Sequence, residues 1–172
     1  PSDISLNISD ARQGTEIQRV EIRTKHGSQQ VYVGDVMSPY SYVAFPLRPE
    51  QGKPAGKVRD GVEFTLTLMY SANHAEDIAA AIWAWETFGG IGARTRRGFG
   101  ALECVGVNGV SPIQPLAGNA LGEIQTKLNM YTVKGTWPPG VPHLVRGMKV
   151  VPPGGRSSAD DAWRYLFDRL KR

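Results

Sequence analysis

Residues 62–100 read VEFTLTLMYSANHAEDIAAAIWAWETFGGIGARTRRGFG, and this stretch decides the fold. From Val62 to Met69, apolar residues alternate with Glu and Thr, which predicts a strand with one buried side and one solvent-facing side. From Ala75 to Phe88, apolar side chains recur at helical spacing, and the Gly-Gly pair directly afterwards ends the predicted helix. A strand, a helix and a glycine-rich loop therefore follow one another without interruption.

The residues that precede this stretch predict further strands. Thr15 to Arg23 and Gln30 to Val33 are rich in β-formers, and the Lys-His-Gly-Ser sequence between them predicts the turn of a hairpin. Tyr40 to Leu47 is aromatic and β-branched and is bounded by Pro39 and Pro46, which predicts an edge or terminal strand. Arg48 to Gly61 is interrupted by Pro and Gly and is predicted to be a loop.

The residues that follow predict a mixture of strands and helices. Ala101 to Val107 and Leu144 to Val151 are apolar enough for strands, and Leu121 to Tyr131 is predicted to be a short helix. A last helix is expected after the serines at 157 and 158, with Trp163 on its apolar stripe. Strands and helices mix without βαβ regularity, so the predicted class is α+β.

Composition narrows the classes of protein. The 172 residues, 41% hydrophobic and 21% charged, suit one ordinary globular domain. No apolar run approaches the ~20 residues that a membrane span needs, so we expect no membrane partner. The single cysteine, Cys104, excludes an internal disulfide framework and a cysteine-based zinc cluster, and favours the reducing cytoplasm. A net charge of +4 permits an anionic partner without requiring one.

The glycine-rich loop at 89–100 is the most informative segment. Five of its twelve residues are glycine and three are arginine. Glycine permits positive φ and close approach to another chain, arginine offers a planar fork suited to phosphate, and Phe99 offers an aromatic face to a base. Such a loop would hold a sugar-phosphate backbone with little reading of sequence. The alternative is a solvated basic turn, which the density of glycine makes less favourable.

This loop is not a nucleotide-binding motif of the common kinds. The Walker pattern needs Gly-Lys-Ser/Thr after a strand and at the start of a helix, whereas here a helix precedes the loop and the loop has no lysine. The predicted RNA-binding residues are the following: Gly89, Gly90, Gly92, Arg94, Thr95, Arg96, Arg97, Gly98, Phe99 and Gly100 in the loop, with Arg48, Lys53, Lys57 and Arg59 from the preceding basic stretch.

The run from Ala81 to Gly100 resembles a known family. Its Trp-rich helix followed by Gly-Gly-Ile-Gly-Ala-Arg-Thr-Arg-Arg-Gly-Phe-Gly is similar to the signature loop of the RAMP superfamily of CRISPR-associated proteins. More narrowly, it resembles the first RAMP subunit of the Cmr (type III-B) effector complex. The resemblance is strong from Tyr40 to Val107 and loose elsewhere, although the closing helix with Trp163 also resembles a downstream segment of that family.

The resemblance implies a ferredoxin-like (RRM-type) fold and RNA-guided interference. It implies a subunit without chemistry of its own, with CRISPR RNA, target RNA and other Cmr subunits as partners and no cofactor. We then expect the strands at 62–69 and 101–107 to pair, and the two basic segments to form one positive surface. The opening strand and helix of a RAMP unit are not evident before Thr15, so the chain is expected to be a piece of a longer protein. Residues 1–152 would form part of the RAMP domain, and 153–172 a C-terminal helix that starts a further segment.

Two other classes of function remain open. Some RAMP relatives cut RNA with histidine as acid or base, so the second hypothesis is a metal-independent endoribonuclease that uses His26 or His74 as general base. His143 follows a Pro-rich break, and no pair of histidines has the i, i+4 spacing of a helical metal site. The third hypothesis is a scaffold whose loop docks a partner protein. We expect no metal and no catalytic residues.

Overall fold

The computed structural model describes residues 4–108, 120–132, 136–141, 143–145, 147–150, 155–156 and 158–170. Its strands are β1 (Ile4–Arg12), β2 (Thr15–Ile17), β3 (Arg19–Thr24), β4 (Gly27–Tyr32), β5 (Val58–Asp60) and β6 (Glu63–Tyr70). Its α-helices are α1 (Ser41–Ala44), α2 (Ala75–Phe88), α3 (Ala120–Tyr131) and α4 (Ala159–Leu170), and short 3₁₀ helices are η1 (Phe45–Leu47), η2 (Ala72–His74) and η3 (Thr95–Arg97). The strands form antiparallel pairs, β1 with β6, β2 with β5 and β3 with β4.

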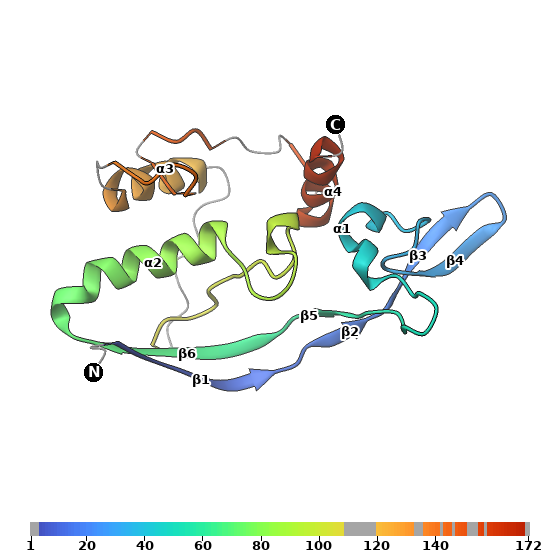
Figure 1. Cartoon of the computed structure of the whole chain (residues 1–172), viewed down its shortest axis with the longest axis horizontal. Helices are drawn as coiled ribbons and strands as arrows, with labels where there is room; N and C mark the ends of the chain where they lie inside the picture. The colour runs from blue at the N-terminus through green and yellow to red at the C-terminus, as the bar shows by residue number, and fades with distance from the viewer. Residues whose placement is uncertain are drawn as a thin grey trace.

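The first two pairs follow one another as a long ribbon, and the β3–β4 hairpin extends beyond its end (Figure 1). The predicted strand at 62–69 is confirmed as β6, but its partner is β1, so the expected pairing with 101–107 is wrong. Strand β1 is not among the predicted strands, although Ile4, Leu6 and Ile8 alternate with polar residues. The predicted hairpin is confirmed as β3–β4, and Thr15–Ile17 belongs to the separate pairing with β5.

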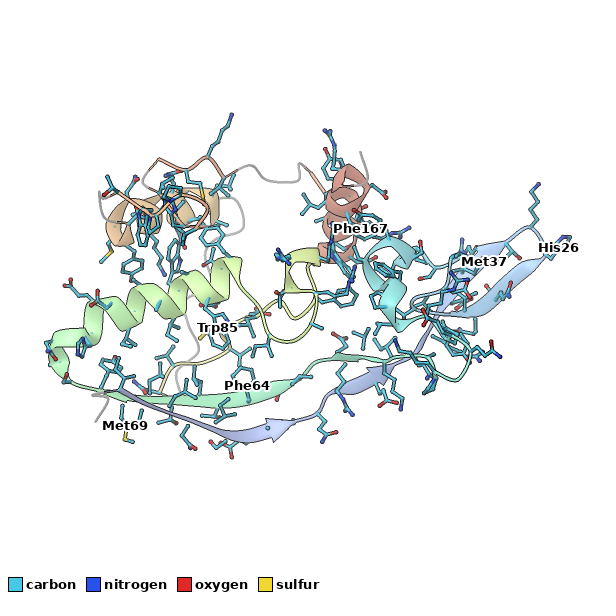
Figure 2. All side chains as sticks on the ribbon, viewed as in Figure 1. His26, Met37, Phe64, Met69, Trp85 and Phe167 are labelled. Atoms are coloured by element: carbon cyan, nitrogen blue, oxygen red, sulfur yellow. The ribbon has the colours of Figure 1, made fainter. Side chains whose placement is uncertain are left out.

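Helix α2 covers one face of the ribbon. Phe64 of β6 and Trp85 of α2 lie in the layer between helix and ribbon (Figure 2). Leu6 and Ile8 of β1 are directly opposite Leu68 and Leu66, so they share this face. They remain 61% and 55% exposed, because the helix covers β6 rather than β1.

Helix α3 packs on the other side of α2 (Figure 1). The Trp83 ring of α2 lies 5.4 Å from the Tyr131 ring of α3, measured between centroids, and Leu128 of α3 is fully buried. The predicted helices at 75–88 and 121–131 are thus confirmed, and Trp83 is a core residue.

The predicted strand at 101–107 is wrong. Residues 101–106 run outside any strand, and the Cys104 backbone N–H donates instead to Glu86 Oε1 of α2 at 2.9 Å. The Glu86 carboxylate thereby accepts the hydrogen bond that this backbone N–H would otherwise donate to a neighbouring strand. The described residues of 144–151 are likewise outside any strand.

The predicted strand at Tyr40–Leu47 is also wrong, because this stretch is helical as α1 and η1. Val43 and Ala44 are fully buried, and burial of these two neighbours suits a compact turn better than a strand that alternates its faces. Pro46 lies in the first turn of η1, where a missing N–H costs no hydrogen bond. The predicted loop at 48–61 is correct except for β5.

Helix α4 begins as its sequence predicts. The Ser158 hydroxyl accepts the Asp161 backbone N–H at 3.1 Å, which is a standard N-cap contact. Phe167 of α4 is buried on the side toward α1 (Figure 2). Of the helices within the described parts of the chain, none is long and apolar enough to cross a membrane.

Candidate functional site

The glycine-rich loop is closed at its base by its own backbone. The Ile91 N–H donates to the Gly100 carbonyl at 2.9 Å, which brings the two ends of the loop together. A Cβ at Gly100 would lie 1.8 Å from the Ile91 carbonyl oxygen, and one at Gly90 would lie 2.7 Å from the Gly100 oxygen. These glycines are therefore required for closure of the loop, before any partner is considered.

Between these ends the backbone takes left-handed conformations. Gly98 has φ +85° and Gly100 φ +66°, and Arg94, which is not glycine, has φ +64° at the start of η3. A non-glycine residue in this region is uncommon and persists where the surrounding structure holds it. The surrounding structure therefore holds the backbone of Arg94 in this conformation.

Helix α4 braces the loop through Trp163. The indole N–H donates to the Arg97 carbonyl at 2.7 Å, and Phe99 packs edge-on against the indole with 5.1 Å between centroids. A Cβ at Gly98 would lie 2.4 Å from Trp163 Nε1, so glycine is needed here for the approach of the indole. Gly98 stays a predicted RNA-binding residue, and its contact with Trp163 gives a second, intramolecular reason for glycine at this position.

Tyr40 extends this brace toward α1. Its ring stacks on Trp163 at 5.3 Å between centroids, and its hydroxyl donates to Asp160 Oδ1 of α4 at 2.8 Å. Burial raises the pKa of the Tyr40 phenol, and the hydrogen bond to Asp160 raises it further, since both favour the neutral form. The residue before α1, the loop and α4 thus meet at one aromatic cluster, formed by Tyr40, Phe99, Trp163 and Phe167.

Two of the loop arginines rest on aromatic rings that precede them in the chain. The Arg94 guanidinium lies over Phe45, 4.7 Å from the ring centroid, and the Arg97 guanidinium lies over Tyr42 at 5.1 Å. Arg97 Nη1 also donates to the Tyr42 hydroxyl at 3.2 Å. Both guanidinium groups line an open cleft of about 420 Å³, whose walls are Val36, Ser41, Tyr42, Phe45, Arg94 and Arg97. This arrangement places two cations at a hollow that is suited to an anionic ligand.

Comparison with known proteins assigns the chain to a family. The sequence model of the RAMP superfamily matches residues 8–103, which is more than half of the chain. The chain belongs to the RAMP superfamily. RAMP proteins are CRISPR-associated proteins that bind or process RNA and act in effector complexes with it. Neither the curated proteins nor the solved structures contain a significant match.

The other predicted contact residues of this RAMP protein lie in different surroundings. Arg96 is exposed, and Arg48 directly follows η1, whose Phe45 lines the cleft. Lys57 and Arg59 both pair with Glu16 of β2, at 2.6 Å and 3.6 Å between the charged atoms. The surroundings of the cations therefore differ along the basic stretch, because Lys57 and Arg59 contact an acidic side chain on the ribbon.

The histidines of the RAMP protein do not converge on one site. His26 lies at the turn of the β3–β4 hairpin (Figure 2). His74 is the last residue of η2, directly before α2, and α2 begins at the end of the long axis opposite this hairpin (Figure 1). The His143 ring stacks on Trp137 at 5.0 Å between centroids. Within the described ranges, no group of three His, Cys, Asp or Glu side chains is arranged to hold a metal ion.

Except for Phe99, the aromatic residues of this site are not predicted as functional from the sequence. Tyr40, Tyr42 and Phe45 fall in a predicted strand, and Trp163 and Phe167 fall in a predicted helix. Their sequence signal is only that the chain contains both an arginine-rich loop and aromatic residues elsewhere, since arginine commonly rests on aromatic faces. That signal does not identify which arginine meets which ring, because the partners are about fifty residues or more apart in the chain.

Proposed function

We propose that this RAMP protein is a non-catalytic RNA-binding subunit of a CRISPR RNA-guided interference complex. In this proposal, loop 89–100 grips the backbone of the guide RNA or of the guide–target duplex. The observation that carries it is the placement of Arg94 and Arg97 on aromatic rings at an open cleft. A guanidinium on a ring keeps its charge and its in-plane donors, which are suited to phosphate oxygens.

The finer assignment is to the first RAMP subunit of the Cmr (type III-B) complex. It rests on the similarity of the Trp-rich helix and glycine-rich loop to that subunit. The partners would then be CRISPR RNA, target RNA and other Cmr subunits, in the cytoplasm. Co-expression of the full-length protein with the other Cmr subunits, followed by affinity purification, tests the assignment: we expect the subunits and guide RNA to co-purify, and their absence would contradict it.

We also propose that the ribbon and α2 are part of a ferredoxin-like (RRM-type) unit. An antiparallel strand pair with a helix on one face supports this, because such a unit packs helices on one side of an antiparallel sheet. The exposed apolar side chains of Leu6 and Ile8 on the same face leave room for a second packed element, such as the other helix of such a unit.

Binding through the loop is tested by replacing Arg94, Arg96 and Arg97 together with Ala. RNA affinity, measured by fluorescence anisotropy over a range of salt concentrations, should fall for every sequence. The slope of log affinity against log salt should flatten by about 2, at roughly 0.7 per single-strand phosphate contact. An unchanged slope would remove the loop from the binding surface and contradict the proposal.

The absence of catalysis is tested separately with labelled guide-repeat RNA. The protein should leave this RNA intact with and without divalent metal, because the sequence shows no acid–base pair and the described residues contain no group of three His, Cys, Asp or Glu side chains arranged to hold a metal ion. Metal-independent cleavage that is lost in His26→Ala or His74→Ala would contradict a non-catalytic role and favour the endoribonuclease alternative.

A further inference from the structure

The cleft beside the glycine-rich loop combines two kinds of surface. One is cationic, because the guanidinium groups of Arg94 and Arg97 line it. The other is apolar, because Val36 and Phe45 line it and are 67% and 59% exposed. Large apolar side chains left in water beside unneutralised cations point to a ligand that carries both an anion and an apolar face.

The arginines retain donors for such a ligand. None of the ion pairs found among the described residues involves Arg94 or Arg97. Arg94 Nε is buried without a hydrogen-bond partner in the described part of the chain, which is a costly state for a donor. Its position is imposed by the left-handed backbone at Arg94 and by the Phe45 ring. The side chain is therefore held ready before any ligand arrives, which lowers the entropy lost on binding.

We infer that this cleft holds one nucleotide of single-stranded RNA, with its phosphate on Arg94 and Arg97 and its base against Phe45 and Val36. The inference deepens the proposed function and rests on it, since it takes RNA as the ligand. Single-stranded bases stack on aromatic side chains, whereas a base within a duplex is already stacked on both faces. A duplex would use the two charges and leave Phe45 and Val36 in water.

The size of the cleft agrees with one nucleotide. A volume of about 420 Å³ lies in the lower part of the range of small-ligand sites. The Tyr42 and Ser41 hydroxyl groups at its wall are further polar groups of the kind that orient a ligand. Neighbouring nucleotides would pass over exposed Arg96 and toward Arg48, which follows η1.

Val36 offers a substitution that enters the cleft without entering the core. Val36→Glu adds a carboxylate that competes with phosphate for the arginines, and Val36→Gln adds the same length without charge. Val62→Glu adds the same charge at a position that is 50% exposed and outside the cleft lining. Affinity for a short oligouridylate should fall at least about tenfold with Val36→Glu. The new carboxylate would face the phosphate of the RNA, and contact between two like charges lowers affinity by at least this factor. Val36→Gln removes the apolar contact with the base but adds no charge, so its loss of affinity should be smaller than that of Val36→Glu. Val62→Glu lies outside the cleft lining and should change the affinity little.

A second measurement locates the base. An oligouridylate carrying 5-iodouridine should, on irradiation, crosslink to the peptide that contains Tyr42 and Phe45, as mapped by mass spectrometry. The oligouridylate should also bind more tightly than an RNA hairpin of equal charge. If RNA binds but Val36→Glu has no effect, or crosslinks map only elsewhere, the nucleotide site is wrong and the proposed RNA-binding function stands. If neither RNA binds, the proposed function fails and the nucleotide site fails with it. Stronger competition by polyglutamate than by RNA would reassign the cleft to an acidic protein partner.

Discussion

Two basic regions of this RAMP protein hold their cations in different ways. Arg94 and Arg97 of the loop rest on aromatic rings, whereas Lys57 and Arg59 of the basic stretch contact the carboxylate of Glu16. A ring supports a guanidinium without removing its charge, but a carboxylate offsets the charge that it contacts. The number of cations in a sequence therefore overstates the positive surface that is free to meet phosphate.

The two regions also differ in how firmly they are held. The loop is closed by the Ile91–Gly100 hydrogen bond and braced by Trp163 from α4. Exposed ion pairs such as those of Glu16 contribute little to stability, because water and salt screen them. Substitutions in the loop should accordingly change both structure and RNA binding, whereas substitutions at 57–59 should change charge alone.

The largest effect is expected from Gly100→Val. Its Cβ would lie 1.8 Å from the Ile91 carbonyl oxygen at a left-handed φ, so the loop cannot close in its present form. We expect a loss of about 2–4 kcal/mol in the free energy of unfolding, measured with urea. RNA affinity should fall at least as far as in the triple arginine variant.

Gly92→Asn is the matched control. Gly92 is also at positive φ, but a Cβ there meets nothing within 4 Å, and Asn tolerates such a backbone better than other residues. If Gly100→Val kept both its stability and its affinity, the loop would not be held by its base, and the contrast between the two regions would be broken.

Trp163→Ala should have the next largest effect. It removes the hydrogen bond to Arg97 and the packing against Phe99 and Tyr40, with an expected cost of about 2–3 kcal/mol for a partly buried Trp. RNA affinity should fall because η3 loses its brace. Trp163→Phe keeps an aromatic ring and loses the hydrogen bond, at a cost of about 1 kcal/mol. Equal RNA affinity in the wild type and Trp163→Ala would show that α4 does not position the arginines.

A smaller effect is expected from the ion pairs at Glu16. Lys57→Ala with Arg59→Ala should flatten the salt slope by less than the roughly 1.4 expected for two free contacts at about 0.7 each. Glu16→Gln should have the opposite sign and steepen the slope, since it releases both cations. A full flattening in the double variant, with no effect of Glu16→Gln, would show that the ion pairs do not withhold these charges.

The smallest effect concerns the pH dependence of the brace. Because the folded-state pKa of Tyr40 is raised, its stabilisation is complete below the unfolded pKa of about 10 and is lost as pH rises through the folded value. The difference in unfolding free energy between the wild type and Tyr40→Phe should be about 1 kcal/mol or less at neutral pH and should shrink above pH ~10. A difference that grew with pH would contradict the hydrogen bond to Asp160.

Local patterns in the sequence determined much of the fold. The alternation of 62–69 predicted β6, the helical spacing of 75–88 predicted α2, and the capped stripe near Trp163 predicted α4. These elements could be predicted because each carries its own periodicity and its own start or stop residues. The glycine-rich loop and its arginines also stand out from sequence alone, and the RAMP match extends the same resemblance over residues 8–103.

Only the tertiary structure decided which partner each of these elements meets. Tyr40–Leu47 has strand-forming residues but is helical, since Val43 and Ala44 are buried together. Strand β6 pairs with β1 rather than with 101–107, whose backbone is bound instead by Glu86. The sequence alone does not distinguish one arginine from another, whereas contacts between residues far apart in the chain place some arginines on aromatic rings and others against carboxylates. Pairings of this kind depend on the fold as a whole, because no local periodicity encodes them.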